Sequence, residues 1–536
     1  MYPRLASASA GPATAPTGTV PPMPPAVRRW LTPAAWVAAV SAALLAIFPL
    51  GFPNYDTIYA LVWGRELAHG ESPDYGAALP PTPHPLTDLI GLVTSPFGEA
   101  PITVTMVLAY LALGLIAFFV YRLGATWFDR PIGAVAALFV LTRAPFLSNG
   151  LRAYIDLPYV ALCLGALLVE AKRPRAGWPV LALLVPAGLL RPEAWGFAIV
   201  YWLWLGFDLR RATPGPMGLY RENSSRYRPI GGLGGWELGW RGERGGRELV
   251  WLAALALAGP VLWVIFDAIT TGDPMYSLTG TQETVETLKR KTGPLDLVLY
   301  GPRALGEVMQ WPGMVGALGG VVLGFAFLRR RSALGIAAAA LALLAFALLA
   351  CAGLAILARY TMLASAVLAI FVAVGLLGWR LLDPGHPWRR RWQVFAGIVA
   401  AMFVIWLPNQ WDLDSKVDAD LTNQAKIEGD LSDLVDAGAF EPLCGPIAVP
   451  NHRAVPRLAF GLDVKPTEIV SASEAGANRE ERAKLAAAGY FVEPASPFVI
   501  HNFILDPNDP TELDIEVPAG FEEVARNESW RVYRRC

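Results

Sequence analysis

The stretch FPNYDTIYALVWGRELAHGESPDYGAALPPTPHPLTD, residues 52–88, follows the first long apolar segment of the chain. It combines acidic side chains and histidines with aromatic rings: Asp56, Glu66, His69, Asp74, His84 and Asp88 beside Tyr55, Tyr59, Trp63 and Tyr75. Most of the following residues, up to about position 408, alternate between lipid-compatible runs and shorter polar loops. A polar, aromatic loop just outside a membrane span is therefore the first candidate for a site of chemistry.

Composition places the chain in a membrane. Of the 536 residues, 54% are hydrophobic and 17% are charged, whereas soluble chains carry about 25% charged residues. The apolar runs approach the ~20 residues that cross a bilayer. They lie at 33–51, 101–121, 131–148, 154–170, 177–191, 194–209, 249–269, 312–328, 333–355, 361–379 and 394–408. These runs predict a polytopic α-helical membrane protein with about eleven transmembrane helices.

Basic residues predict the orientation. Arg28 and Arg29 precede the first span and should hold residues 1–27, a Pro/Ala-rich stretch expected to be disordered, in the cytoplasm. Every loop that then falls inside is basic, as the positive-inside rule requires. One of them, 210–248, is rich in Gly and Arg but lacks the Lys-Ser/Thr of a phosphate-binding loop, so we expect a flexible linker.

The predicted domains are therefore a transmembrane domain, 28–408, and an extracytoplasmic region, 409–536. The latter carries 23 Asp/Glu against 12 Lys/Arg. PIAVP, YFVEP, PFVIHNFIL and WRVYRR suggest short strands, and LTNQAKIEGDLSDLVDAGA a helix, which together predict a small acidic α+β domain. Cys444 and Cys536 lie in this region, where oxidation is allowed. Either a bridge or two free thiols is compatible with the sequence, because it does not give their distance.

Asp56 opens a predicted short helix, NYDTIYALVWGRELAHG, that is expected to pack against protein because its polar residues are scattered. Its carboxylate could cap that helix, a role that Asn54 could equally fill. Alternatively, it could act as a general base on an acceptor hydroxyl.

Two further acidic and basic pairs stand at the outer ends of spans. Arg152 and Asp156 are four residues apart, so they could form an intrahelical ion pair; alternatively, Asp156 joins Asp56 around an acceptor or a divalent ion. Arg191 and Glu193 flank a turn between two spans. Arg191 could bind a phosphate in fork geometry or simply snorkel to the membrane surface.

The later outer loops add cations and tyrosines. The loop at 270–311 supplies Tyr276 and three basic residues, Lys289, Arg290 and Lys291. Basic residues in an outer loop are an exception to the positive-inside pattern. They could bind a substrate anion or ordinary lipid headgroups. Arg359 and Tyr360 stand at another outer mouth. The histidines lack zinc-ligand spacing, and no nucleic-acid motif stands out.

Several of these segments, in order, resemble the membrane glycosyltransferases of the GT-C fold, which include protein O-mannosyltransferases, aminoarabinose transferases and mycobacterial arabinosyl- and mannosyltransferases. The resemblance covers about 33–408. It is carried by NYDTIYALVWGRELAHG, YIDLPYVALCLGALLVE, LLRPEAW, GDPMYSL and ARYTMLASAVLAI. It implies a polyprenyl-phosphate sugar donor, an extracytoplasmic glycan, lipid or protein acceptor, and inversion at the anomeric carbon, in the plasma membrane.

The resemblance also implies roles by position. Asp56 would be the general base and Asp156 a second catalytic carboxylate, while the donor phosphate would be bound by Arg191, Arg359, Lys289 or Arg290. The expected substrate-binding set is Tyr55, Tyr59, Glu66, His84, Arg152, Glu193, Tyr276 and Tyr360. Mg²⁺ or Mn²⁺ is an open option, although Thr57 stands where the family often has a second acidic residue next to the first. The alternative function is a transporter or flippase for a lipid-linked or small anionic substrate, but no internal repeat supports it.

Overall fold

The structure is a computed structural model that describes residues 25–49, 51–98, 100–211, 236–240, 246–473, 479–503 and 517–536. The eleven predicted apolar runs fall largely on helices, although 131–148 is divided between two helices, α5 and α6, and 194–209 ends in a strand. In the described residues, six helices are long and apolar enough to cross a membrane, or seven if the bent pair α5–α6 counts as one. The membrane-helical class is therefore confirmed, but the count of eleven spans is not.

In the part of the chain that the structure describes, the helical body is built from twelve helices, of which several are short. They are α1 Pro25–Ile47, α4 Ala100–Trp127, α5 Arg130–Leu141, α6 Ala144–Leu151, α7 Asp156–Lys172, α8 Trp178–Leu190, α9 Glu193–Gly206, α10 Gly246–Thr271, α12 Gly293–Phe327, α13 Arg329–Cys351, α14 Met362–Leu377 and α15 Pro387–Asp436. The fifth and sixth predicted spans correspond to α8 and α9, of 13 and 14 residues. These two helices are shorter than a full crossing requires.

The centre of this body is α14. Its apolar window is 83% buried within the protein, whereas the other candidate spans are at most half buried. Contact with α12 passes through glycines: a Cβ at Gly320 would lie 1.8 Å from the Phe371 carbonyl oxygen, and one at Gly375 would lie 2.5 Å from that of Gly316. Small residues let helix backbones approach closely in a membrane, where packing replaces the hydrophobic effect.

Two helix breaks meet beside this centre. The pair α5–α6 bends by 60°, and α12 is interrupted at Gln310, which has a left-handed φ of 56°. The Gln310 side-chain oxygen accepts hydrogen bonds from Arg143 Nη1 at 2.9 Å and Trp406 Nε1 at 2.8 Å. These bonds tie both breaks to α15.

Three further α-helices are short: α2 Tyr55–Ala68, α3 Pro85–Thr94 and α11 Tyr276–Thr287. Of these, α2 packs against both α3 and the C-terminal domain. The helix predicted around Asp56 is thus confirmed as α2. It packs against protein as expected, because Ile58, Tyr59, Val62 and Trp63 are buried.

The C-terminal domain contains a five-stranded sheet in the order β4-β3-β5-β7-β6. Its elements are β3 Ile447–Val449, α16 Val455–Leu462, β4 Ile469–Ser471, α17 Arg479–Ala486, β5 Tyr490–Pro494, α18 Pro497–Asn502, β6 Glu522–Arg526 and β7 Trp530–Arg534. β3 pairs in parallel with β4 and β5, while β7 is antiparallel to β5 and β6. The strands predicted at PIAVP, YFVEP and WRVYRR are confirmed, but that at PFVIHNFIL is wrong, since Pro497 opens helix α18, as proline favours the first turn.

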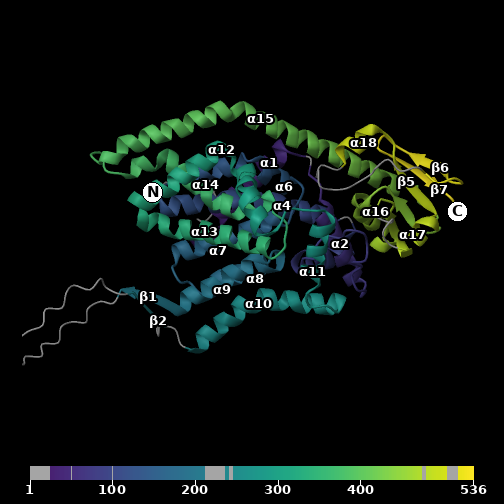
Figure 1. The fold of residues 1–536 in the computed structure, drawn as a ribbon, viewed down its shortest axis with the longest axis horizontal. Helices are drawn as coiled ribbons and strands as arrows, with labels where there is room; N and C mark the ends of the chain where they lie inside the picture. Colours follow the sequence, from purple (N-terminus) through teal and green to yellow (C-terminus); the bar gives the residue numbers. More distant parts are fainter. Residues whose placement is uncertain are drawn as a thin grey trace, which may run out of the picture.

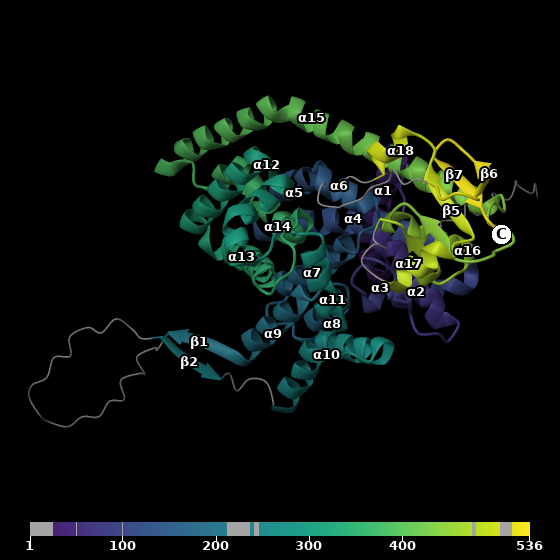
Figure 2. The same ribbon diagram turned by 45° about the vertical axis from the view of Figure 1, so that its right-hand side comes forward.

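The helix α15 joins the two parts of the molecule. It runs for 50 residues along one side of the helical body and into the C-terminal domain (Figures 1 and 2). The predicted helix LTNQAKIEGDLSDLVDAGA is therefore the end of a longer one. Cys444 and Cys536 form a disulfide, with their Cα atoms 5.9 Å apart.

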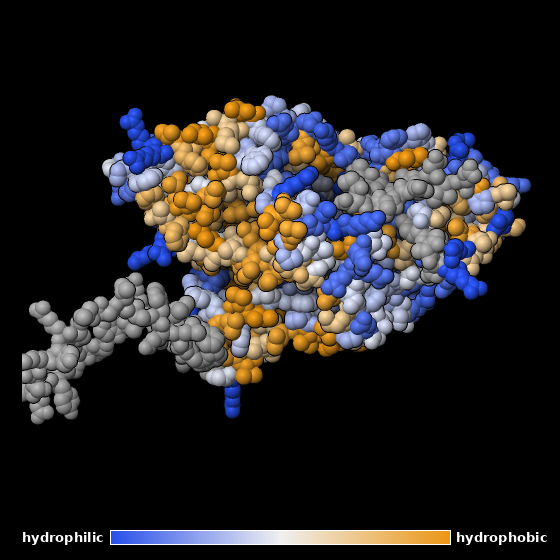
Figure 3. Space-filling model, in the orientation of Figure 1, coloured by the Kyte–Doolittle hydropathy of each residue, from blue (hydrophilic) through white to orange (hydrophobic). Residues whose placement is uncertain are grey.

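The two ends of the molecule differ in character. The hairpin β1 Phe207–Arg211 and β2 Trp236–Trp240 extends from the end of the helical body opposite the C-terminal domain (Figure 1). Hydrophobic residues gather over the helices, and hydrophilic ones are more frequent over the C-terminal domain (Figure 3). Most of the predicted linker 210–248 and of the predicted disordered stretch 1–27 lies outside the described residues. The described parts are ordered instead: α1 begins at Pro25, β2 pairs with β1, and α10 begins at Gly246.

Candidate active site

The N-terminus of α2 places Asp56. The Asn54 side-chain oxygen accepts from the backbone N–H groups of Asp56 and Thr57, at 2.7 and 3.2 Å, so Asn54 is the cap. The alternative in which Asp56 caps the helix is therefore wrong, so the Asp56 carboxylate is not used by the helix N-terminus. That carboxylate lies 3.3 Å from Arg359 Nη1, with both side chains about one quarter exposed.

A buried ion cluster adjoins this pair. Arg191, just after α8, donates from Nη1 to Asp156 at 2.6 Å and from Nη2 to Glu193 at 2.7 Å. All three side chains are less than 10% exposed. The predicted intrahelical pair of Arg152 with Asp156 is wrong, because Asp156 faces Arg191 instead.

Tyr360 and Tyr154 join the two groups of charges. The Arg191 guanidinium lies 4.0 Å from the centre of the Tyr360 ring, and that of Arg359 lies 5.5 Å from the same ring and 4.9 Å from Tyr154. Arg359 is also within electrostatic range of Asp156. The sequence-predicted residues Asp56, Asp156, Arg191, Glu193, Arg359 and Tyr360 therefore form one cluster, to which Tyr154, missed from the sequence, also belongs.

His84 lies at the same place, on the loop before α3. Burial, together with the positive charges of Arg191 and Arg359, lowers the pKa of His84 to about 3. Its Nδ1 is buried without a hydrogen-bond partner among the described residues, and its ring packs edge-on against Trp263 at 5.5 Å. A neutral imidazole beside two guanidiniums can accept or donate a hydrogen bond without adding charge.

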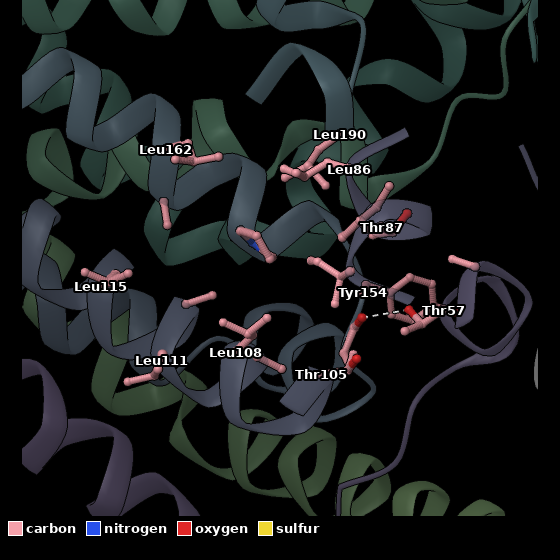
Figure 4. A pocket seen from close by; sticks show the side chains of 18 of the residues that line it. Thr57, Leu86, Thr87, Thr105, Leu108, Leu111, Leu115, Tyr154, Leu162 and Leu190 are labelled. Carbon is pink, nitrogen blue, oxygen red and sulfur yellow. Dashed lines mark hydrogen bonds between the residues drawn. The ribbon is translucent and has the colours of Figure 1, made fainter. Parts of the chain in front are cut away.

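An apolar cavity of about 430 Å³ opens next to this cluster, between α2, α3, α4, α7 and α8. Tyr154 and Thr57 stand side by side at one end of it, and the leucines of α4 and α7 line the other (Figure 4). Leu190, the residue before Arg191, is also part of its wall. The cavity therefore leads from the charged cluster into the membrane-spanning helices.

The other predicted residues lie elsewhere. Glu66 is buried at the opposite end of α2 and accepts from Asp74 N at 2.7 Å, and Tyr59 is buried against Trp63. Tyr276 lies beside Tyr75, with ring centres 5.4 Å apart. These positions support the fold around the cluster.

The basic loop at Lys289–Lys291 and the side chain of Tyr55 lie nearer to the charged cluster. Lys289 is exposed and Arg290 half-buried, and the carbonyl of the next residue, Lys291, accepts from Ile356 N, three residues before Arg359. Tyr55, the residue before Asp56, donates to the Leu79 carbonyl at 3.0 Å. It contacts the C-terminal domain through His452 and Arg453.

The acidic residues of the cluster were candidates for ligands of a divalent metal ion. Among the residues that the structure describes, no group of three or more His, Cys, Asp or Glu side chains is placed to hold a metal ion. Asp56 and Asp156 each face a guanidinium, which is the position that a cation would need. Binding of Mg²⁺ or Mn²⁺ stays a prediction.

Comparison with known proteins gives a fold. No family model matches the sequence, and no curated protein matches it. Among solved structures, the chain is similar to ArnT from Cupriavidus metallidurans bound to undecaprenyl phosphate, with a TM-score of 0.51 and 13% identity over 95% of this chain and 98% of that one. It also matches the oligosaccharyltransferase of Archaeoglobus fulgidus, with a TM-score of 0.46 and 12% identity over 87% of this chain and 70% of that one.

Proposed function

We propose, from the GT-C fold that this chain shares with ArnT, that it is an inverting glycosyltransferase. It would move a hexosyl or pentosyl unit from a polyprenyl-phosphate donor to a glycan, lipid or protein on the outer side of the plasma membrane. The observation that carries the proposal is the Asp56–Arg359 pair, 3.3 Å apart, at the mouth of an apolar cavity. A base, a phosphate-binding cation and a place for a lipid chain thus stand together.

The donor would use the cation and the cavity. A polyprenyl phosphate joins an anionic head to a long apolar chain, and the cavity wall is mostly apolar. The apolar lipid chain of the donor would enter between α4 and α7, while its phosphate would bind Arg359 beside Tyr154. A planar guanidinium suits phosphate oxygens in fork geometry. Arg191 and the Lys289–Arg290 loop would add positive potential.

The chemistry is a single displacement. Asp56 would take the proton from the acceptor hydroxyl as its oxygen attacks the anomeric carbon, and the bond from that carbon to the phosphate oxygen would break on the opposite face. The polyprenyl phosphate leaves with the electron pair as an anion that Arg359 stabilises. One positioned base contributes about 10²–10⁴-fold in rate.

The topology follows from the same proposal. Reaction outside the cytoplasm places α2 and the C-terminal domain on the outer side and the β1–β2 hairpin, at the opposite end, in the cytoplasm. The N-terminus would then be cytoplasmic. The short helices α8 and α9 would complete a count of eleven spans if each crosses a locally thinned bilayer as one arm of a tight hairpin.

Transfer from radiolabelled polyprenyl-phosphate sugars, in membranes carrying the wild type or Asp56→Asn, tests the proposal. The variant should lose at least about a hundredfold in rate. Asp412→Asn, in an exposed pair with Lys416, is the matched control and should keep full activity. Full turnover by Asp56→Asn would reject Asp56 as the base, and movement of a substrate across the bilayer with no donor consumed would favour the transporter.

A further inference from the structure

Arg152 is a cation without a counterion. It follows α6, and its carbonyl accepts from the backbone and side-chain nitrogens of Asn54, at 2.9 and 2.8 Å. Its guanidinium makes no hydrogen bond or ion pair with any described residue, and its Nε is buried. Asp420 on α15 is within electrostatic range but does not pair with it. Leaving a partly buried charge unpaired is costly, so its counterion is expected to be a ligand.

The C-terminal domain presents a sheet edge to the same place. The chain leaves β3 through α16 to β4 on one side and returns through α17 to β5 on the other. In such sheets, ligands bind at the carboxyl ends of the strands where the order reverses. The residues that follow β3 are Asn451, His452 and Arg453, with Asn451 Oδ1 accepting from Arg453 N at 2.9 Å.

This edge touches the start of α2. The His452 ring packs edge-on against Tyr55 with centres 5.4 Å apart, and the Arg453 guanidinium lies 5.4 Å from the centre of the same ring. Arg453 is also within electrostatic range of Arg152. The Arg453 guanidinium, from the C-terminal domain, therefore lies beside the residue that precedes Asp56 and within electrostatic range of Arg152, from the helical body.

This space is separate from the donor cations. Arg359 and Arg191 stack on Tyr360, and Arg359 faces Asp56 from the cavity side. Arg453 contacts Tyr55 at the same helix end from the C-terminal domain, and Arg152 is within electrostatic range of Arg453 and of Asp420 on α15. The acceptor hydroxyl must contact the base and attack the face of the anomeric carbon opposite the donor phosphate, so cations near Asp56 but apart from Arg359 stand where the acceptor would bind.

We infer that Arg152 and Arg453 bind an anionic group of the acceptor, a phosphate or a carboxylate near the hydroxyl that receives the sugar. The inference rests on the proposed function and specifies its acceptor class. The anion would supply the counterion that Arg152 lacks, and it would fix the hydroxyl against Asp56. Charge-assisted hydrogen bonds of this kind are the strong ones in proteins.

Direct binding to the purified full-length chain in detergent tests this inference. Glucose 6-phosphate, glucuronate and glucose would be titrated by calorimetry into wild type, Arg152→Gln, Arg152→Lys and Arg359→Gln, before and after saturation with undecaprenyl phosphate. The two anionic sugars should bind the saturated wild type at least about tenfold more tightly than glucose. Arg152→Gln should lose that preference, Arg152→Lys should keep part of it, and Arg359→Gln should retain it. Arg303→Gln, an exposed cation paired with Glu307, controls for loss of charge.

The outcomes separate the two proposals. Equal binding of anionic and neutral sugars to the wild type would overturn the acceptor inference, as would an Arg152→Gln variant that keeps the preference. Loss of undecaprenyl phosphate binding in Arg152→Gln would assign Arg152 to the donor instead and would also overturn it. If the wild type bound no undecaprenyl phosphate but kept the Arg152-dependent preference for anionic sugars, the proposed donor would fail while the anion site stands.

Discussion

Replacing Arg191 by glutamine should mainly lower the stability of the folded protein, and its effect on donor binding should be the smaller one. Arg191 Nε and Nη2 both donate to one Glu193 oxygen, at 3.0 and 2.7 Å, and Nη1 donates to Asp156 at 2.6 Å. The second oxygens of Asp156 and Glu193 are buried without a partner among the described residues. Glutamine would leave two buried carboxylates without their cation.

The magnitude follows from that geometry. Breaking a buried ion pair by removing one partner costs about 3–5 kcal/mol, because the remaining charge is left uncompensated. Arg359→Gln removes a single 3.3 Å contact between side chains that are 22% and 28% exposed. Exposed pairs are worth about 1 kcal/mol or less, and this partly buried pair should fall between that value and the cost of the buried cluster. The first variant should therefore lose more stability than the second.

Two measurements on each variant check this contrast. Thermal unfolding in detergent should show a large fall for Arg191→Gln and a small one for Arg359→Gln. In the transfer assay, the donor KM should rise more for Arg359→Gln than for Arg191→Gln. Asp156→Asn is the matched control: Arg191 keeps Glu193, so its loss of stability should be smaller than that of Arg191→Gln.

An Arg191→Gln variant that unfolds like the wild type but has a raised donor KM would refute this reasoning. Arg191 would then be a donor ligand, and the carboxylates would be stable without it. Equal losses of stability in Arg191→Gln and Arg359→Gln would also contradict it.

Two further predictions concern the C-terminal half of α2 and the disulfide. Burial raises the pKa of Glu66 to about 7, so its proton stabilises the folded state fully below about pH 4.3 and this contribution is lost as pH rises through 7. In urea titrations, Glu66→Gln should therefore raise the free energy of unfolding by about 1–3 kcal/mol at pH 8 and leave it unchanged at pH 4. The same gain at both pH values would contradict the raised pKa of Glu66. Cys444→Ser should cost about 2–4 kcal/mol, since the bridge closes a 92-residue separation; dithiothreitol should destabilise the wild type but not the variant, and equal sensitivity of both would contradict the bridge.

The membrane class and the cluster could be predicted because both depend on local signals. Apolar runs of span length define the helices, and charges at span mouths are costly enough to indicate sites. Asp56, Asp156, Arg191 and Arg359 were therefore found although they are up to 303 positions apart.

The pairings could not be predicted, because they depend on three-dimensional packing. Spacing favoured Arg152 with Asp156, yet a positive-φ residue, Ala153 at 51°, turns the chain between them, and Asp156 meets Arg191. The sequence favours Asn54 and Asp56 equally as the cap, because it does not show which side-chain oxygen the backbone N–H groups face. The apolar cavity left no sequence signal, since its leucines are ordinary span residues.

The shared core of α2 and the C-terminal domain has a consequence for biosynthesis. Tyr59, Val62 and Trp63 pack in one cluster with Ile427, Leu458 and Trp530. At about 5–20 residues per second, translation would need on the order of tens of seconds to pass from the first set to the second. During that interval the aromatic face of α2 would lack its packing partners and would be a target for chaperones and proteases.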